Sequence, residues 1–314
     1  ANTTASNNTA VGRDALGATT TGERNTAVGQ QSFKTNTTGS YNTALGRSAL
    51  YGNTTANYNV AVGYEALYAN TTGYINTAVG VSALGSNVVG LGCTAVGDNA
   101  LADNLNSYNT AVGRSALANN TSADSNTAVG SIALFTNTTG ASLVGIGESA
   151  LYANTTGSNN TAVGRFSLTA NTTGANNVAM GKDALASNTT GTQNTAVGHI
   201  AGGSIVTGYS NTCIGFYAGV YQNNLTTGYD NTLVGAYCRA SSGTSNAEVV
   251  VGRYALGQGA STGTIGVNGN GVHIALNNST TSWSKHSDER LKENIANSTA
   301  GLSFINDLRP VTYT

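Results

Sequence analysis

The stretch NTAVG at residues 8–12 decides the fold, because it returns unchanged at residues 25–29, 76–80 and 194–198, among other places. Its closing glycine marks a period. Twelve of the fourteen intervals between successive marker glycines are 17 residues, one is 16, and one is 20 where VYQNNL (residues 220–225) lengthens the repeat. The marker glycines are Gly12, Gly29, Gly46, Gly63, Gly80, Gly97, Gly113, Gly130, Gly147, Gly164, Gly181, Gly198, Gly215, Gly235 and Gly252. A repeat this regular predicts one array rather than two ordinary domains.

The consensus N-T-A-V-G-x-x-A-L-x-x-N-T-T-G-x-x gives each column a physical role. The residue before the marker glycine is aliphatic in every copy, from Val11 to Val251, and the residue four after it is Leu or Phe from Leu16 to Leu185. We expect both columns to face a core. The NTTG corner supplies Asn and Gly, which tolerate left-handed backbone. Each repeat is therefore expected to hold two short extended segments and two turns.

This pattern predicts an all-β fold, a repetitive β-solenoid or β-roll of about fifteen 17-residue coils over residues 1–256. Helical repeats are longer and richer in helix formers, whereas this repeat carries β-branched residues and glycine corners. Stacking at about 4.8 Å per coil would give a rod of roughly 70 Å. An Asn column four places before the glycine, Asn8 to Asn231, is expected to form an amide ladder between coils.

The amount of aliphatic bulk in each coil indicates an oligomer. Ordering the backbone of one coil costs roughly 17 to 34 kcal/mol, while burying two large aliphatic side chains recovers about 3 to 6 kcal/mol. We therefore predict an intertwined parallel homotrimer, with either the Leu or the Val column pointing at a shared axis.

Composition argues against two kinds of partner, nucleic acid and membrane, and indicates the state of the cysteines. Charged residues are 9% of the chain and the net charge is −1, so no basic face for nucleic acid is expected. Apolar runs are far shorter than the roughly 20 residues that cross a bilayer, which argues against membrane insertion. The chain opens inside a repeat, so we expect the natural protein to begin further upstream. Cys93, Cys213 and Cys238 replace Asn or Ala in the repeat and are expected to be buried thiols.

No metal or cofactor is expected, and no enzyme acting on a foreign substrate. The histidines His199, His273 and His286 are scattered, without a second ligand at metal-binding spacing. The glycine-rich stretch GVNGNG (residues 266–271) resembles a phosphate loop only in composition and is interpreted as the exit from the rod.

One break in the repeat predicts a local change of shape. The Leu column is replaced by Gly202, Gly219 and Arg239, and the insertion at residues 220–225 falls in the same region. We expect the rod to change cross-section there or to push a loop outward.

Two resemblances follow from these residues. The NTAVG phrase followed by Ala-Leu resembles the repeats of trimeric autotransporter adhesin heads over residues 8–256, although the period here is longer. SDERLKENI (residues 287–295) and INDLRPVTY (residues 305–313) resemble the opening of the intramolecular chaperone domain that ends many phage tail fibres and tailspikes. That resemblance covers only the last 28 residues, so we expect the natural chain to continue beyond Thr314.

In the chaperone family a Ser-Asp pair marks a self-cleavage point and a lysine five residues after the serine assists. The resemblance therefore implies Ser287 as nucleophile, Lys292 as its helper and Asp288 directly after the scissile bond. The alternative is that Ser287 or Asp288 is the N-cap of a helix running through Leu291 and Ile295. A second short helix before Pro310 would complete a C-terminal helical segment. The domain plan is thus a rod (1–256), a neck (257–286) containing Trp283, and the start of a chaperone-like domain (287–314).

Two functions remain open. One is a structural fibre shaft, of a virion tail fibre or an extracellular surface fibre, that forms or presents an adhesion element for a host glycan or receptor. The other is a bacterial trimeric adhesin or repeat-surface binder of carbohydrate or ice. It would use Thr ladders and aromatic stacks such as Tyr51, Tyr68, Phe135 and Tyr152 five places after the glycine, or Tyr41, Tyr58 and Tyr108 five places before it.

Overall fold

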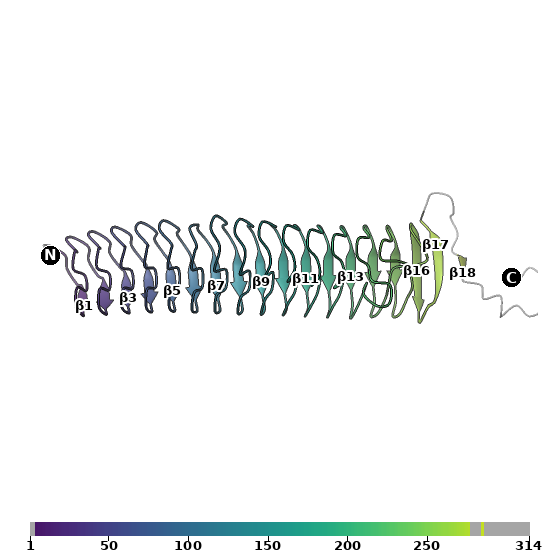
Figure 1. The fold of residues 1–314 in the computed structure, drawn as a ribbon, viewed down its shortest axis with the longest axis horizontal. Helices are drawn as coiled ribbons and strands as arrows, with labels where there is room; N and C mark the ends of the chain where they lie inside the picture. The colour runs from purple at the N-terminus through teal and green to yellow at the C-terminus, as the bar shows by residue number, and fades with distance from the viewer. Residues whose placement is uncertain (1–3, 277–283, 286–314) are drawn as a thin grey trace, which may run out of the picture.

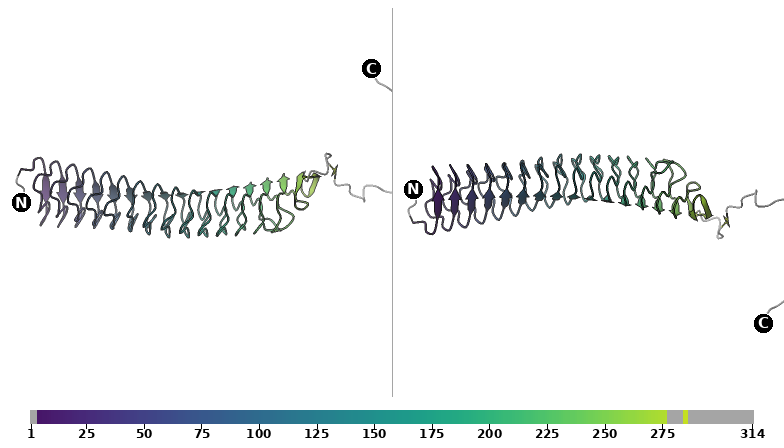
Figure 2. Two further views of the ribbon diagram at one scale, coloured as in Figure 1. Left: turned by 90° about the horizontal axis from the view of Figure 1, so that it is seen from above. Right: turned by 90° about the horizontal axis from the view of Figure 1, so that it is seen from below.

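The computed structural model describes residues 4–276 and 284–285 and shows one long rod. Successive coils stack along the axis in chain order, each with one strand on the same side (Figure 1). The rod bends gently along its length (Figure 2). Within the described residues there is no α-helix, so the predicted all-β solenoid with a 17-residue coil is confirmed. The predicted C-terminal helical segment lies outside the described residues.

Every coil contributes one three-residue strand, and after the last coil come two six-residue strands and a two-residue strand. The strands are β1 (Thr9–Val11), β2 (Thr26–Val28), β3 (Thr43–Leu45), β4 (Val60–Val62), β5 (Thr77–Val79), β6 (Thr94–Val96), β7 (Thr110–Val112), β8 (Thr127–Val129), β9 (Val144–Ile146), β10 (Thr161–Val163), β11 (Val178–Met180), β12 (Thr195–Val197), β13 (Thr212–Ile214), β14 (Thr232–Val234), β15 (Val249–Val251), β16 (Thr262–Val267), β17 (Asn270–Ala275) and β18 (Ser284–Lys285).

The strands form one sheet whose register follows the repeat. From β1 to β15, each strand pairs in parallel with its neighbour in the next coil. Residues at the same position of the repeat lie side by side, so that Thr9 lies beside Thr26 and Ala10 beside Ala27. β15 pairs in parallel with β16, and β16 then turns back to pair antiparallel with β17. The turn lies within the glycine-rich stretch, where Asn268 and Gly269 both have positive φ, as a tight hairpin requires.

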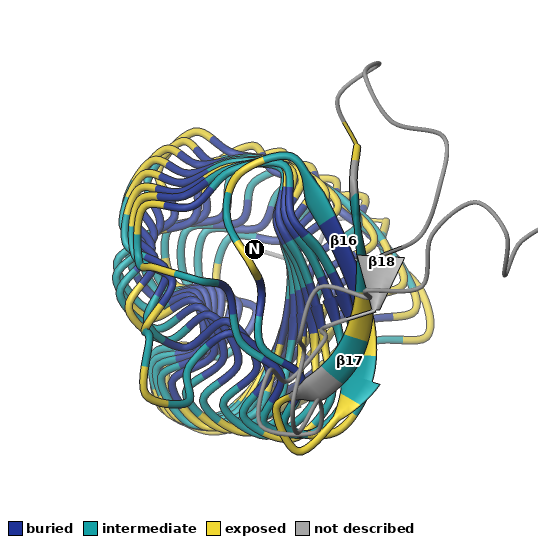
Figure 3. Cartoon of the chain, turned by 90° about the vertical axis from the view of Figure 1, so that its right-hand side faces the viewer, coloured by how far each residue is buried: buried dark blue, intermediate teal, exposed yellow. Residues whose placement is uncertain are grey.

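The middle residue of each strand points into the coil and its two neighbours point outward. The interior is filled by that residue, usually Ala, by the small residue three after the marker glycine, and by the Leu column. From Leu50 to Leu185 the Leu column is fully buried, as predicted. The end view shows the buried residues lining the inside of the coils (Figure 3).

The prediction that the column before the glycine faces a core is wrong for the single chain. Val11 is 57% exposed and Leu45 47%, and the rest of this column is exposed or half-buried. The reason is strand alternation. Alternation places the middle side chain on one face and its two neighbours on the other. The Leu column already fills the interior, so the small Ala fits inside and the larger Thr and Val point outward.

The predicted second extended segment is also absent from the coils. The residues after the glycine turn instead, because two of them adopt left-handed backbone; in one coil these are Ser48 at φ 58° and Leu50 at φ 51°. Left-handed backbone is unfavourable for leucine. Burial of the side chain offsets that cost, and the Leu50 amide still donates to the Ala66 carbonyl of the next coil at 3.0 Å.

The Asn column before the strand links coils mainly through backbone groups. The Asn25 side-chain oxygen accepts from the Asn42 amide of the next coil at 2.9 Å, and its Nδ2 donates to the Gly39 carbonyl at 2.8 Å. Direct amide-to-amide bonds occur at only some steps of this column, such as Asn42 to Asn25 at 3.2 Å. The expected ladder therefore exists, but most of its inter-coil bonds join a side chain to a main chain.

A second Asn ladder runs through the NTTG corners, where the sequence had indicated only turns. Asn70 Nδ2 donates to Asn53 Oδ1 of the preceding coil at 2.8 Å and to the Gly73 carbonyl at 2.9 Å. The same pattern links Asn154, Asn171 and Asn188, and these side chains are fully buried. Most coils up to Asn188 thus contain two buried amides in addition to their aliphatic core, and these amides add hydrogen bonds between coils.

The corner ladder ends where the Leu column ends. Asn188 Oδ1 has no hydrogen-bond partner, because the next coil carries the buried Ile205 at the corner position. In that coil Gly202 stands at the position of the Leu column. One coil later, Gly219 stands at that position and the buried Leu225 stands at the corner position. The large apolar side chain has moved from one column to the other, which keeps the core filled.

This exchange predicts strong coupling between residues 202 and 205. A Cβ on Gly202 would lie 3.0 Å from Leu185 Cδ2 and 3.2 Å from Ile205 Cδ1, so Gly202→Leu alone overpacks the coil. Ile205→Asn alone leaves a void. The double variant restores the regular Leu and Asn pair and supplies a donor for Asn188. We expect it to be at least about 1 kcal/mol more stable than the sum of the single effects. Guanidinium unfolding of the four proteins measures this, and additive effects would show that no exchange exists.

The insertion at residues 220–225 forms the expected outward loop. Gln222 and Asn224 are exposed, while Leu225 returns to the core. The neighbouring strands β13 and β14 keep their register in spite of the loop. Figure 2 shows the loops at this end of the rod swinging away from the line of the regular coils.

Candidate functional site

The three residues implied in self-cleavage, Ser287, Asp288 and Lys292, lie outside the described residues, as do His286 and Trp283. The described surface offers three other features, which are a flat strand face, stacked aromatic pairs and an aromatic cluster beside the insertion.

The flat face consists of the two outward columns of strands β1 to β15, and we call it the strand face. One column is mostly Thr, and the other is the aliphatic column from Val11 to Val251. Along it Val79, Val96, Val112 and Ile146 expose 36–38% of their surface, and Met180 exposes 43%. An aliphatic stripe that continues along the whole rod is unusual for the surface of a soluble monomer and is typical of an interaction surface.

The aromatic residues noted in the repeat form isolated stacked pairs rather than long ladders. Tyr41 stacks on Tyr58 and Tyr51 on Tyr68, each with ring centroids 5.1 Å apart. Phe135 stacks on Tyr152 at 5.6 Å. These pairs contribute to coil-to-coil packing, and several rings remain partly exposed.

A cluster of aromatic side chains that the sequence reasoning missed lies in the last coils. His199 stacks on Phe216 at 5.3 Å, Tyr217 on Tyr237 at 5.7 Å, and Tyr237 on Tyr254 at 4.7 Å. These residues follow the marker glycines by one or two places, where most earlier coils carry polar residues such as Arg47 and Ser48. This change from polar to aromatic residues is visible in the sequence and could have predicted the cluster. It occurs in the same coils as the insertion.

Among the described residues, the thiols and charged groups show no reactive arrangement. Cys93, Cys213 and Cys238 are free and buried, as predicted. Burial raises the pKa of all three thiols, that of Cys238 to about 12, which keeps them protonated and unreactive. Across residues 4–276 and 284–285, no three His, Cys, Asp or Glu side chains lie close enough to hold a metal ion. The ion pairs there are exposed or half-buried, and Arg165 with Glu148 at 3.0 Å is an exposed one.

The one-sheet solenoid with its repeated outward columns is a β-solenoid repeat protein, and its elongated form fits a fibre. The comparison with known families adds the second element: residues 287–314 match the family described as chaperone of endosialidase. The resemblance of SDERLKENI to an intramolecular chaperone domain is thereby confirmed at the level of the family. No curated protein matches the chain. A search of the described residues for a helix long and apolar enough to span a membrane found none.

Proposed function

We propose that the protein is the shaft of a virion tail fibre or of an extracellular surface fibre, and that it works as a parallel homotrimer. The observation that carries this proposal is the aliphatic stripe of the strand face, which continues along all fifteen coils. The match of residues 287–314 to the chaperone of endosialidase family supports it, because a dedicated folding module suits a long repetitive assembly. Adhesion to a host glycan or receptor is part of the proposal.

The burial of the two aliphatic columns indicates which of them would face the axis of the proposed trimer. The Leu column is buried inside its own chain, so it is not free to form a shared core. The aliphatic column of the strand face is exposed or half-buried in the single chain, so we assign it to the interface. The three chains would then lie side by side through their sheets. The neck over residues 257–286 would connect this rod to the chaperone-like module.

The interface proposal is tested by placing charge on the strand face. Val112→Lys with Val129→Lys adds two cations to each chain at the proposed axis, so three chains would bring six together. We expect this variant to sediment as a monomer with an unchanged β-type circular dichroism spectrum. The matched control is Ser122→Lys with Thr139→Lys, at exposed positions of the corners NTSA (residues 120–123) and NTTG (residues 137–140), and it should stay trimeric. Trimers of the Val variant would show that the interface lies elsewhere.

We also propose that Ser287 and Lys292 act only in cutting the protein's own chain, after Ser287 and before Asp288. The Ser287 hydroxyl, with Lys292 as its base, would promote breakage of the Ser287–Asp288 peptide bond. The Asp288 amine would leave, and water would supply the second oxygen of the new Ser287 carboxylate. The expected product in the mass spectrum of the parent protein is a fragment that ends at Ser287. An uncut parent chain would leave Ser287 and Asp288 with the helix N-cap role.

A specific observation favours one alternative. The strand face carries a Thr column beside the aliphatic column, in the regular register that would let it order water or bind a repetitive surface. Ice binding by this face predicts thermal hysteresis of the purified rod. The homotrimer instead buries the face, so a trimeric rod should show no hysteresis.

A further inference from the structure

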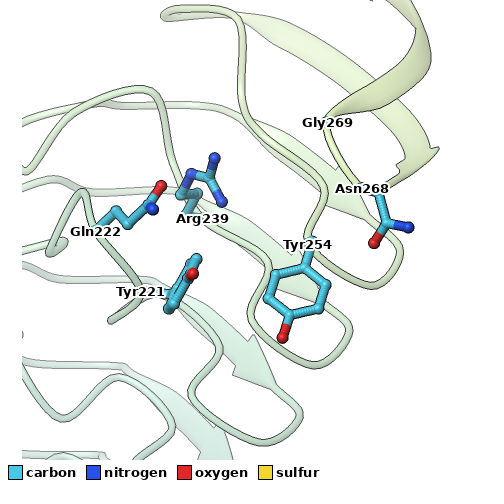
Figure 4. A pocket seen from close by; sticks show the side chains of 6 residues that line it. All are labelled: Tyr221, Gln222, Arg239, Tyr254, Asn268 and Gly269. Atoms are coloured by element: carbon cyan, nitrogen blue, oxygen red, sulfur yellow. The ribbon is translucent and has the colours of Figure 1, made fainter.

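An open pocket lies where the insertion, the last two coils and the hairpin turn meet. Its volume is about 330 Å³, and it is lined by Tyr221, Gln222, Arg239, Tyr254, Asn268 and Gly269. Figure 4 shows the Arg239 guanidinium and the Tyr221 ring on one side, the Asn268 amide on the other and the Tyr254 ring between them. Each wall comes from a departure from the repeat: the inserted loop, the arginine in the Leu column, the aromatic cluster and the glycine-rich turn.

Backbone hydrogen bonds hold these walls in place. The Arg239 amide donates to the Ala255 carbonyl at 3.0 Å, and the Arg239 carbonyl accepts from the Gly257 amide at 2.9 Å. On the turn side, the Gly269 amide donates to the Tyr254 carbonyl at 3.1 Å. The pocket is therefore formed before a ligand arrives, which lowers the entropy cost of binding.

The aromatic wall is also fixed in orientation. Tyr254 stacks flat on Tyr237, and Tyr221 packs edge-on against both rings, 5.5 Å from Tyr254 and 5.2 Å from Tyr237. Tyrosine rings held this way offer flat apolar surface together with a polar edge. That combination suits a ligand with both C–H faces and hydroxyl groups.

The charge in the pocket is positive and uncompensated. Arg239 lies over the Tyr221 ring at 5.5 Å, and no described carboxylate forms an ion pair with it. Arg253 lies next to the pocket, over Tyr254 at 4.9 Å. The nearby Glu248 is fully buried and accepts from the Ser241 and Gly259 amides, so it belongs to the core. None of the lining residues is acidic.

We propose that this pocket binds an acidic saccharide, a sugar unit that carries a carboxylate or sulfate group. The Arg239 guanidinium would pair with the anionic group, for which its planar set of donors is well suited. The Tyr254 and Tyr221 rings would contact the sugar's C–H surface, and the Gln222 and Asn268 amides would hydrogen-bond its hydroxyls. This gives the proposed adhesion role a chemical target, and it rests on that role.

The test measures binding of trigalacturonic acid and a hyaluronan tetrasaccharide to the whole chain by calorimetry. The comparison ligands are maltotriose, which is neutral, and inorganic phosphate, a bare anion. Saturable binding of at least one acidic sugar, with weaker binding of both comparison ligands, supports the proposal. Failure of both acidic sugars to bind overturns it, and so does phosphate binding that displaces the bound sugar.

Variants locate the site. Arg239→Gln should weaken binding of the acidic sugar by about tenfold or more, and Tyr221→Ala should weaken it as well. The control is Arg114→Gln, an exposed arginine several coils away, which should leave the affinity unchanged. Equal binding by the Arg239 variant would place the sugar elsewhere. A failed binding assay on a protein that still has the mass of a trimer would refute this inference and leave the proposed fibre intact.

Discussion

Ending the chain at Ser287 before expression is expected to abolish most of the soluble, regular rod and to yield aggregated or misregistered assemblies. The cause lies in the repeat itself. β1 to β15 present nearly the same columns, so three chains shifted by one coil would still match over fourteen of the fifteen coils. Such near-equivalent registers differ little in free energy, and repeat arrays can start to pair at any point. A C-terminal module that trimerises first would align the three ends.

The control for this deletion removes the same residues after assembly. A protease site introduced directly after Ser287 allows the segment to be cut from a finished rod. Sedimentation and electron microscopy then compare the two preparations. The late cut should leave the rod intact. Soluble, regular trimers from the early deletion would show that residues 288–314 do not act in folding.

The largest effect of a single substitution is expected at a marker glycine. Gly147 has φ 129°, and a Cβ there would lie 2.6 Å from the carbonyl carbon and oxygen of Gly164 in the next coil. Gly147→Ala therefore combines backbone strain with a collision against main chain that cannot move aside. We expect a loss of about 2 to 6 kcal/mol in the free energy of unfolding.

The matched control is Gly145→Ala, two residues earlier in the same coil. Gly145 occupies the inward strand position where Ala128 and Ala162 stand in neighbouring coils, so an alanine there restores the repeat. Its Cβ would lie 3.1 Å from Leu134 Cγ, a tight contact that a side chain can relieve. We expect a change within about 1 kcal/mol, of either sign. Guanidinium unfolding measures the stability of both variants. Equal stability of Gly147→Ala and Gly145→Ala would contradict the close stacking of coils at the marker glycine.

The repeat made the architecture predictable because a 17-residue period fixes which residues stack. The buried Leu column, the buried thiols and the outward loop at the insertion could all be foreseen from single positions. The direction of the Val column could not, because an aliphatic column indicates contact with some apolar surface, either inside the chain or between chains. The choice depends on what else fills the coil: the Leu column occupies most of the interior, which leaves room for the central alanine of the strand.

Other features depended on geometry that the sequence hides. In the sequence, the Asn residues of the corner ladder from Asn36 to Asn188 indicate only turns, because Asn is common in turns. Their burial becomes visible only when the coils stack. The shift of the large apolar residue from Gly202 to Ile205 needed knowledge that the two columns share one core. The pocket around Arg239 combines residues up to 48 positions apart, from Tyr221 to Gly269, and no single motif announces it.

The mass of the purified chain in solution shows whether the chain forms a homotrimer. The parallel homotrimer is what links the strand face, the register problem and the chaperone-like segment. Multi-angle light scattering on residues 1–314, whose chain mass is 31.5 kDa, should give three times that value and the hydrodynamic radius of an elongated particle. A stable, homogeneous species of 31.5 kDa would contradict the account.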